Sequence, residues 1–267
     1  TVVFGMGTGV SPKRINTGQN LTYLILPFQW LSHTFMKNAF IAIIIITPLF
    51  GLLSTMVVSN KMSFFADSLG HGAFTGIAVG ILLGGIDPMW GATLFSICFA
   101  IAITIIKNKG TSSTDTIIGV FSSTSIALGL VLMSFSSSLS KFSSYLVGDL
   151  LSISQNQIIL LIFVFIAIIV LWSLIFNKLL VTSLNTSLAN SRGMNTLLIE
   201  IIFTCTIAVI VTITIRWVGL LIINSLLVLP AAAARNISRN IRQYHLFSIL
   251  ISIFSGIVGL IISYYLN

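Results

Sequence analysis

The sequence predicts an all-α polytopic membrane protein with about eight hydrophobic helices. Hydrophobic residues make up 56% of the 267 residues and charged residues only 7%, whereas a soluble domain carries about 25% charged residues. The apolar residues are gathered into long runs, most of them close to the roughly 20 residues that a helix needs to cross a bilayer. The basic residues lie mainly in alternate connections between these runs, which is typical of a multi-pass protein.

Eight apolar runs follow one another along the chain, and each predicts one helix. Residues 1–34 are expected to form an N-terminal tail with an interfacial lead-in, and residues 35–267 the transmembrane domain. The seventh run is short, so we expect other helices to shield it. The runs cover residues 39–58, 64–84, 89–106, 115–135, 157–176, 196–215, 217–230 and 246–264.

The basic residues predict the orientation of these helices. Alternate threading places eight Lys and Arg on one side and five on the other, of which two are in the tail. Cytoplasmic loops carry an excess of Lys and Arg, so the first side is predicted to be cytoplasmic and the N-terminus outside. Membrane topology therefore accounts for the net charge of +8 better than nucleic-acid binding does. The eight residues are Lys61, Lys107, Lys109, Lys178, Arg192, Arg235, Arg239 and Arg242.

The second run begins with a carboxylate and an imidazole one helical turn apart. Asp67 and His71 are two of only five acidic residues and three histidines in the chain. An Asp at mid-bilayer costs roughly 2.5–3.5 kcal/mol, so such a residue is a functional-site hypothesis by default. Positions i and i+4 share a helix face, and this pair suits a proton relay or half a site for a divalent metal. The structural alternatives are a helix cap that answers Lys61, and a core histidine bonded to a carbonyl.

Small residues recur every four positions in the same run, and they form a continuous stripe beside the Asp67/His71 face. Such a stripe lets helix backbones approach closely in a membrane. It predicts close helix packing, and it consists of Ser68, Gly72, Gly76, Gly80 and Gly84.

The later runs carry fewer polar candidates. Hydroxyl residues at 122–125 favour helix packing over a hydrated path, and Asp115 is expected to cap the fourth helix. Glu200 is the only glutamate. It either serves a cation path or answers Arg192 near the cytoplasmic boundary, and the second interpretation is favoured.

The sequence contains none of the catalytic motifs that would indicate an enzyme. GxSxG, HExxH and P-loop patterns are absent, and the two cysteines provide no disulfide framework. If transport is driven by ATP, hydrolysis is expected to take place on another chain.

Four stretches, in the same order along the chain, resemble the membrane permeases of ABC-type zinc, manganese and iron importers. The resemblance covers about residues 26–265. The stretches are KMSFFADSLGHG at residues 61–72, DTIIGV at 115–120 with the following Ala127-Leu128-Gly129, YLVGDLL at 145–151, and VGLLIINSLLVLPAAAAR at 218–235.

This resemblance implies a permease of the same general type as the cobalamin and siderophore importers, the type II ABC importers. It implies a homodimer with two cytoplasmic ATP-binding subunits and an extracytoplasmic metal-binding lipoprotein. Asp67 and His71 match the family positions implicated in metal passage, and the segment after Pro230 matches the region that docks the ATPase. The chain departs from many zinc members, which carry a histidine where it has Ser122-Ser123. The family also commonly continues through another hydrophobic helix beyond the position of Asn267.

The homodimer that the resemblance implies would let Asp67 and His71 of two subunits bind one metal ion. A two-fold dimer would offer two Asp oxygens and two His nitrogens, a set that suits transported Zn²⁺ or, with further oxygens, Mn²⁺. No permanently bound cofactor is expected, and the lipid bilayer is the remaining partner. The alternative is an ion- or proton-coupled secondary transporter or channel that uses the Asp67/His71 pair as its relay.

The segment of about residues 230–242 is predicted to transmit the motion of the ATPase. Proline suits the first turn of a helix, and alanines favour helix and keep it slim. We therefore expect a short basic helix that begins at Pro230. Its residues are Pro230, Ala231, Ala232, Ala233, Ala234, Arg235, Arg239 and Arg242.

Overall fold

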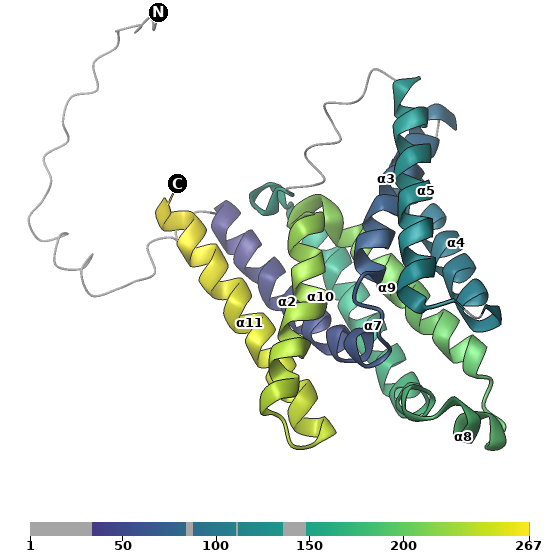
Figure 1. Ribbon diagram of the computed structural model, residues 1–267. Helices are drawn as coiled ribbons and strands as arrows, with labels where there is room; N and C mark the ends of the chain where they lie inside the picture. The colour runs from purple at the N-terminus through teal and green to yellow at the C-terminus, as the bar shows by residue number, and fades with distance from the viewer. Residues whose placement is uncertain (1–33, 84–87, 111, 136–147, 267) are drawn as a thin grey trace, which may run out of the picture.

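The computed structural model describes residues 34–83, 88–110, 112–135 and 148–266 (Figure 1). Regular structure within these ranges is helical throughout, and eight of the helices are long and apolar enough to cross a membrane. The predicted fold class is confirmed. The interfacial lead-in before Thr34 and the small residue Gly84 lie outside the described residues. The helices are α2 (Thr34–Ser59), α3 (Phe65–Leu83), α4 (Pro88–Lys109), α5 (Thr114–Ser134), α7 (Gln155–Leu184), α8 (Thr186–Ser191), α9 (Thr196–Val218), α10 (Leu220–Ile237) and α11 (Ile241–Leu266), with a 3₁₀ turn η2 (Leu150–Ser152).

The helices form two groups that meet at α9. On one side α2 packs against α10, α11 and α7, and on the other α3 packs against α4 and α5. The central helix α9 contacts α4, α3, α7 and α10, and its Ile207, Ile210 and Val211 are fully buried. The largest hydrophobic core therefore runs through both groups.

Small hydroxyl side chains join neighbouring helices, as expected where apolar surface alone does not drive association. Ser54 on α2 and Ser248 on α11 lie 2.9 Å apart, oxygen to oxygen. The hydroxyls of Thr104 on α4 and Thr204 on α9 are also 2.9 Å apart. Each bond lets two backbones approach while the polar group stays satisfied.

The stripe of small residues on α3 lies against α4. A Cβ added at Gly76 would come within 2.7 Å of the Ala92 Cα, and one at Gly80 would be 3.6 Å from the Gly91 Cα. Ser68 is fully buried. The backbones of α3 and α4 are therefore close enough at Gly76 that no larger residue fits without displacement.

The seventh apolar run belongs to α10 from Leu220 onward, and this helix continues to Ile237 because the alanines after Pro230 extend it. Other helices shield only one of its faces. Ile223 and Leu227 are fully buried, whereas Leu221 and Leu229 are exposed.

The N-cap of α5 also differs from the expectation. Ser113, not Asp115, caps this helix, and its hydroxyl accepts a hydrogen bond from the Thr116 backbone N–H at 3.2 Å. A serine hydroxyl fills this position well, so Asp115 falls in the first turn.

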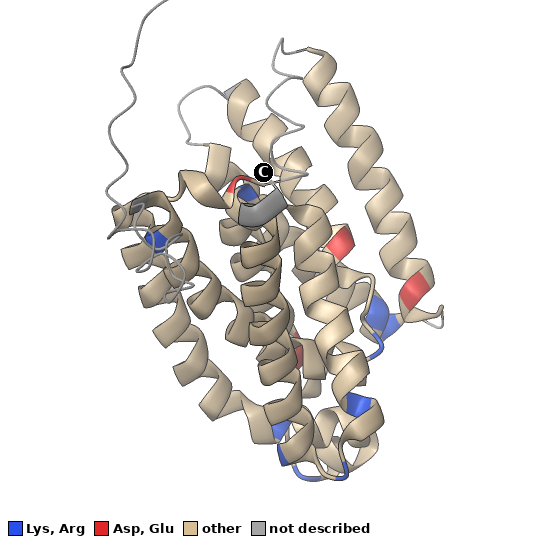
Figure 2. Cartoon of the chain, turned by 90° about the vertical axis from the view of Figure 1, so that its left-hand side faces the viewer, with Lys and Arg blue, Asp and Glu red and all other residues tan. Residues whose placement is uncertain are grey.

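The two ends of the bundle differ in charge (Figure 2). At one end lie Lys37, in the first turns of α2, and Arg216, whose carbonyl accepts from the Asp149 N–H at 3.2 Å. At the other end Lys61 and Lys107 line one polar pocket. The α10–α11 turn lies at that same end, since the Tyr244 hydroxyl donates to the Thr55 carbonyl at 3.3 Å. Most described basic residues therefore share one end.

Candidate metal site at the start of α3

A tight turn sets the position of the Asp67/His71 pair. Lys61 adopts a left-handed backbone with φ of 55°, and the buried Met62 donates its N–H to the Val57 carbonyl at 2.9 Å. The chain then enters α3, with Asp67 in its first turn. The unpaired N–H groups at a helix N-terminus favour a carboxylate there.

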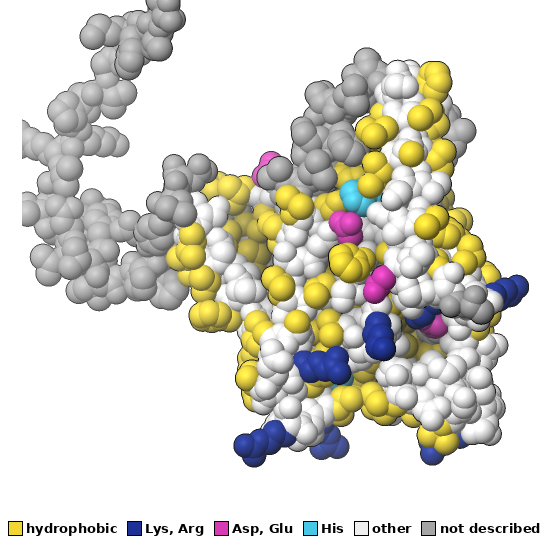
Figure 3. Space-filling model, viewed as in Figure 1, with side chains coloured by type: hydrophobic (Ala, Val, Ile, Leu, Met, Phe, Trp, Pro, Cys, Tyr) yellow, Lys and Arg dark blue, Asp and Glu magenta, His cyan; other side chains and the backbone are white. Residues whose placement is uncertain are grey.

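Asp67 and His71 face each other across one helical turn. The distance from His71 Nε2 to Asp67 Oδ2 is 3.5 Å. The His71 side chain is 22% exposed and the Asp67 side chain is 42% exposed. Two zinc ligands at about 2.1 Å in a tetrahedral arrangement lie about 3.4 Å apart. The pair is therefore spaced to share one ion, and it is open enough on one side to receive it. Acidic and histidine side chains lie among hydrophobic ones on the face drawn in Figure 3.

A third residue, which the sequence reasoning missed, joins this site from α10. The Asn224 side-chain Nδ2 donates to Asp67 Oδ1 at 2.7 Å. The available signal was an amide inside the apolar run 217–230, where it needs a buried partner. Each oxygen of the Asp67 carboxylate thus faces a different group.

The pair does not form a complete metal site within the described part of the chain. No group of three or more His, Cys, Asp or Glu side chains comes together there. The described residues therefore bring together two side chains that could bind a metal, and a complete site would need further ligands.

Glu200 lies in a different environment from the pair. Its Oε1 is paired with the Lys107 Nζ, and its Oε2 accepts from the Asn108 amide at 2.7 Å. The expectation that it answers Arg192 is wrong, because the packing of α9 on α4 places Lys107 opposite the carboxylate. Together these residues line a polar pocket of about 250 Å³ at the basic end.

The segment of residues 230–242 does not begin a helix at Pro230. Pro230 is buried inside α10, where its fixed φ fits the helix and the lost N–H bond to the Leu226 carbonyl is tolerated, as in many membrane helices. The expected short helix is therefore wrong. The basic residues instead span the last turn of α10, the connecting turn and the first turn of α11, at Arg235, Arg239 and Arg242.

The alanines of this segment alternate between core and surface. Ala231 and Ala234 are fully buried against Tyr244 of α11, whereas Ala232 and Ala233 are exposed. The α10–α11 turn therefore presents a slim surface flanked by arginines.

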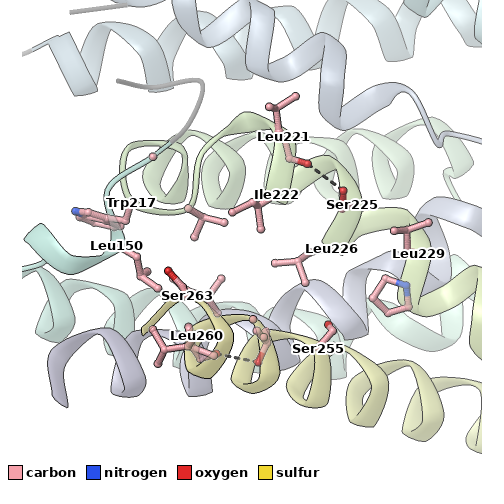
Figure 4. Close-up of a pocket in the computed structure, with 18 of the residues that line it drawn as sticks. Leu150, Trp217, Leu221, Ile222, Ser225, Leu226, Leu229, Ser255, Leu260 and Ser263 are labelled. Atoms are coloured by element: carbon pink, nitrogen blue, oxygen red, sulfur yellow. Dashed lines mark hydrogen bonds between the residues drawn. The ribbon is translucent and has the colours of Figure 1, made fainter. Parts of the chain in front are cut away.

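An apolar cavity of about 790 Å³ lies between α2, α10 and α11 (Figure 4). Leu221, Ile222 and Leu229 of α10 line it, opposite Ser255 and Leu260 of α11. Asp67, His71 and Asn224 are not among its lining residues, so this cavity and the polar pair occupy different places.

The model of the ABC 3 transport family matches residues 32–267. The chain belongs to this family. It is 32% identical over 215 residues to the high-affinity zinc uptake system membrane protein ZnuB of Haemophilus influenzae, covering 79% of this chain and 81% of the relative. It is 28% identical over 233 residues to the manganese import system permease protein ScaB of Streptococcus gordonii, covering 87% and 84%.

Two solved structures share the fold of this chain. PsaBC from Streptococcus pneumoniae, in complex with Fab, matches with a TM-score of 0.77 at 27% identity, covering 92% of this chain and 88% of the other. An inward-facing putative metal-chelate type ABC transporter matches with a TM-score of 0.69 at 13% identity, covering 98% and 85%, and supports the fold alone. The chain is thus a multi-pass membrane protein of the ABC 3 transport family, and it shares its fold with a putative metal-chelate type ABC transporter.

Proposed function

We propose that this chain is the permease subunit of an ATP-driven importer for a divalent transition metal, zinc or manganese, with iron as a third candidate. The observation that carries the proposal is the Asp67/His71 pair, spaced 3.5 Å apart at the start of a membrane helix. Carboxylate and imidazole ligands suit both zinc and manganese. The names of the relatives, a zinc uptake protein and a manganese import permease, support the same class of substrate.

The complete transport site is a homodimer interface. A two-fold axis would bring together two Asp67 and two His71 side chains, because it places the same surface patch on both subunits. Their partial exposure leaves them accessible to such a partner. Weak binding at a movable interface serves transport, because the ion has to leave as readily as it enters. The metal is substrate, and no resident cofactor is required.

The protein lies in the inner membrane of the cell, and the basic end of the bundle faces the cytoplasm. Two cytoplasmic ATP-binding subunits dock there, on the α10–α11 turn. The docking surface comprises the exposed Ala232 and Ala233 together with Arg235, Arg239 and Arg242, all at the basic end. The excess of Lys and Arg supports this orientation. An extracytoplasmic metal-binding protein delivers the ion at the opposite end, which is also the side of the N-terminus.

Uptake of radioactive Zn²⁺ or Mn²⁺ by the complete complex in liposomes tests the metal role. We expect Asp67→Ala and His71→Ala each to reduce uptake to the level without ATP, because each removes a ligand. Membrane insertion should be unaffected, since removing a polar group lowers its cost. The matched control is Asp115→Ala, which removes an exposed carboxylate from the first turn of α5 and should keep the wild-type rate. Wild-type uptake in both site variants would refute the proposal.

A secondary transporter that uses the pair as a proton relay is distinguished by the same assay. Such a protein would work without an ATPase. Full uptake by the purified chain alone, in liposomes without ATP, would replace the importer with that function.

A further inference from the structure

Asn224 is an exception on the inward face of α10. The neighbouring buried residues of that helix are apolar, namely Leu220, Ile223, Leu226 and Leu227. The Asn224 Oδ1 is buried and has no hydrogen-bond partner among the described residues. An unsatisfied buried acceptor costs folding free energy. The amide oxygen therefore does not explain why an asparagine occupies this position. The amide nitrogen does, because Nδ2 donates a hydrogen bond to Asp67.

The orientation of this amide follows from the charge of its partner. The Nδ2 lies 2.7 Å from Asp67 Oδ1, and exchanging the amide atoms would place two acceptors at that distance. The donor therefore faces the ionised carboxylate. With Oδ1 occupied in this way, the other oxygen, Oδ2, is left facing His71 Nε2 at 3.5 Å.

We infer that Asn224 is a positioning residue for the transported metal, acting through Asp67; this rests on the proposed function. Its amide fixes the rotation of the carboxylate so that one oxygen is presented to the ion beside His71. Groups that hold a metal-binding carboxylate by hydrogen bonds change affinity or activity by about 10- to 100-fold when they are removed. Asn224 has a second effect, since the bond links the metal ligand on α3 to α10, the helix that ends at the α10–α11 turn.

Direct metal binding to the purified complex of this chain with its ATPase tests the inference, without the binding protein that would otherwise set the affinity. Mn²⁺ and Zn²⁺ are titrated separately in competition with a chelating indicator, and thermal unfolding is recorded on the same samples. We expect Asn224→Leu and Asn224→Ala to weaken binding by about 10- to 100-fold without lowering the unfolding temperature in the case of Leu. Asn224→Gln, which keeps the donor, should restore most of the affinity.

Ser225→Ala is the matched control, because Ser225 is the next residue of α10, is exposed, and donates to the Leu221 carbonyl of its own helix, at 3.1 Å. Its affinity should equal that of the wild type. Unchanged affinity in Asn224→Leu and Asn224→Ala would overturn the inference. Equal losses in Asn224→Leu and Asn224→Gln would also overturn it, because the donor would then be irrelevant.

Asp67→Ala separates this inference from the proposed function. If Asp67→Ala binds metal as tightly as the wild type, the metal role of the pair fails. If Asp67→Ala loses binding while the Asn224 variants retain it, only the positioning role of Asn224 fails.

Discussion

Asp67 and Glu200 are both carboxylates on apolar helices, yet their partners differ in kind. Glu200 is paired with an ammonium and an amide, Lys107 and Asn108, and it is only 12% exposed. Asp67 faces an imidazole and an amide, and it is 42% exposed. A fixed positive charge competes with a cation for a carboxylate, whereas a neutral imidazole joins in binding it. The Glu200 carboxylate is therefore already neutralised by a fixed charge, whereas the Asp67 carboxylate remains open to a cation.

Glu200→Gln tests this division. We expect a loss of about 1–3 kcal/mol in stability, because the partly buried Lys107 ammonium loses its charged partner. Metal uptake per folded complex should remain near the wild-type rate. Thermal unfolding and uptake measured together check both outcomes, and Lys107→Gln in the Glu200→Gln background should recover part of the stability. Loss of uptake at unchanged stability would instead place Glu200 on the cation path.

The residues that sequence could predict are those whose partners are local. Asp67 and His71 are four positions apart, so helix geometry alone brings them together. Asn224 and Asp67 are 157 positions apart, and Glu200 and Lys107 are 93 apart. Those contacts depend on how helices pack, which no local pattern specifies.

At the scale of single helices, hydropathy was sufficient to predict eight spans, since a bilayer fixes their length and composition. The prediction that a helix begins at Pro230 is wrong for a physical reason. The rule that proline starts a helix reflects one missing N–H, but a membrane helix tolerates that loss in its interior. Local rules therefore located the helices better than their ends.

The packing of α3 on α4 makes a specific prediction at Gly76. A Cβ there would approach the Ala92 Cα within 2.7 Å and the Gly91 carbonyl oxygen within 2.8 Å, so the obstacle is backbone. We expect Gly76→Leu to separate the two helices and to cost about 1–3 kcal/mol or more. Thermal unfolding and size-exclusion chromatography of the complex measure this.

Gly119 provides the control for that substitution. It lies on α5, and an added Cβ would meet no atom within 4 Å. Gly119→Leu should leave stability within about 0.5 kcal/mol, as for other surface changes. If Gly76→Leu and Gly119→Leu unfold at the same temperature, the close α3–α4 contact does not contribute to the stability of the protein.

At the scale of the whole molecule, α10 connects the Asp67/His71 pair to the basic end. Asn224 lies in its second turn and Arg235 in its last, so about 16 Å of helix separates them at roughly 1.5 Å per residue. Pro230 lies between them and removes one backbone hydrogen bond, which is where a helix bends most readily. The same helix therefore links the α10–α11 turn with Asn224, the residue that bonds Asp67.

Ala232→Phe tests this connection from the basic end. Ala232 is exposed on the last turns of α10, and its neighbours Ala231 and Ala234 are buried, so a large side chain at 232 obstructs docking without disturbing the core. We expect ATP hydrolysis to become independent of metal uptake, or the ATPase to dissociate, while Mn²⁺ binding at Asp67 and His71 persists. Ser187→Phe, a bulky change at an exposed position of α8, should retain normal coupling. The measurement is the number of metal ions imported per ATP hydrolysed in liposomes. An unchanged ratio in Ala232→Phe would mean that the ATPase engages another surface, because a docking helix cannot accept a phenylalanine in place of a methyl group without losing contact.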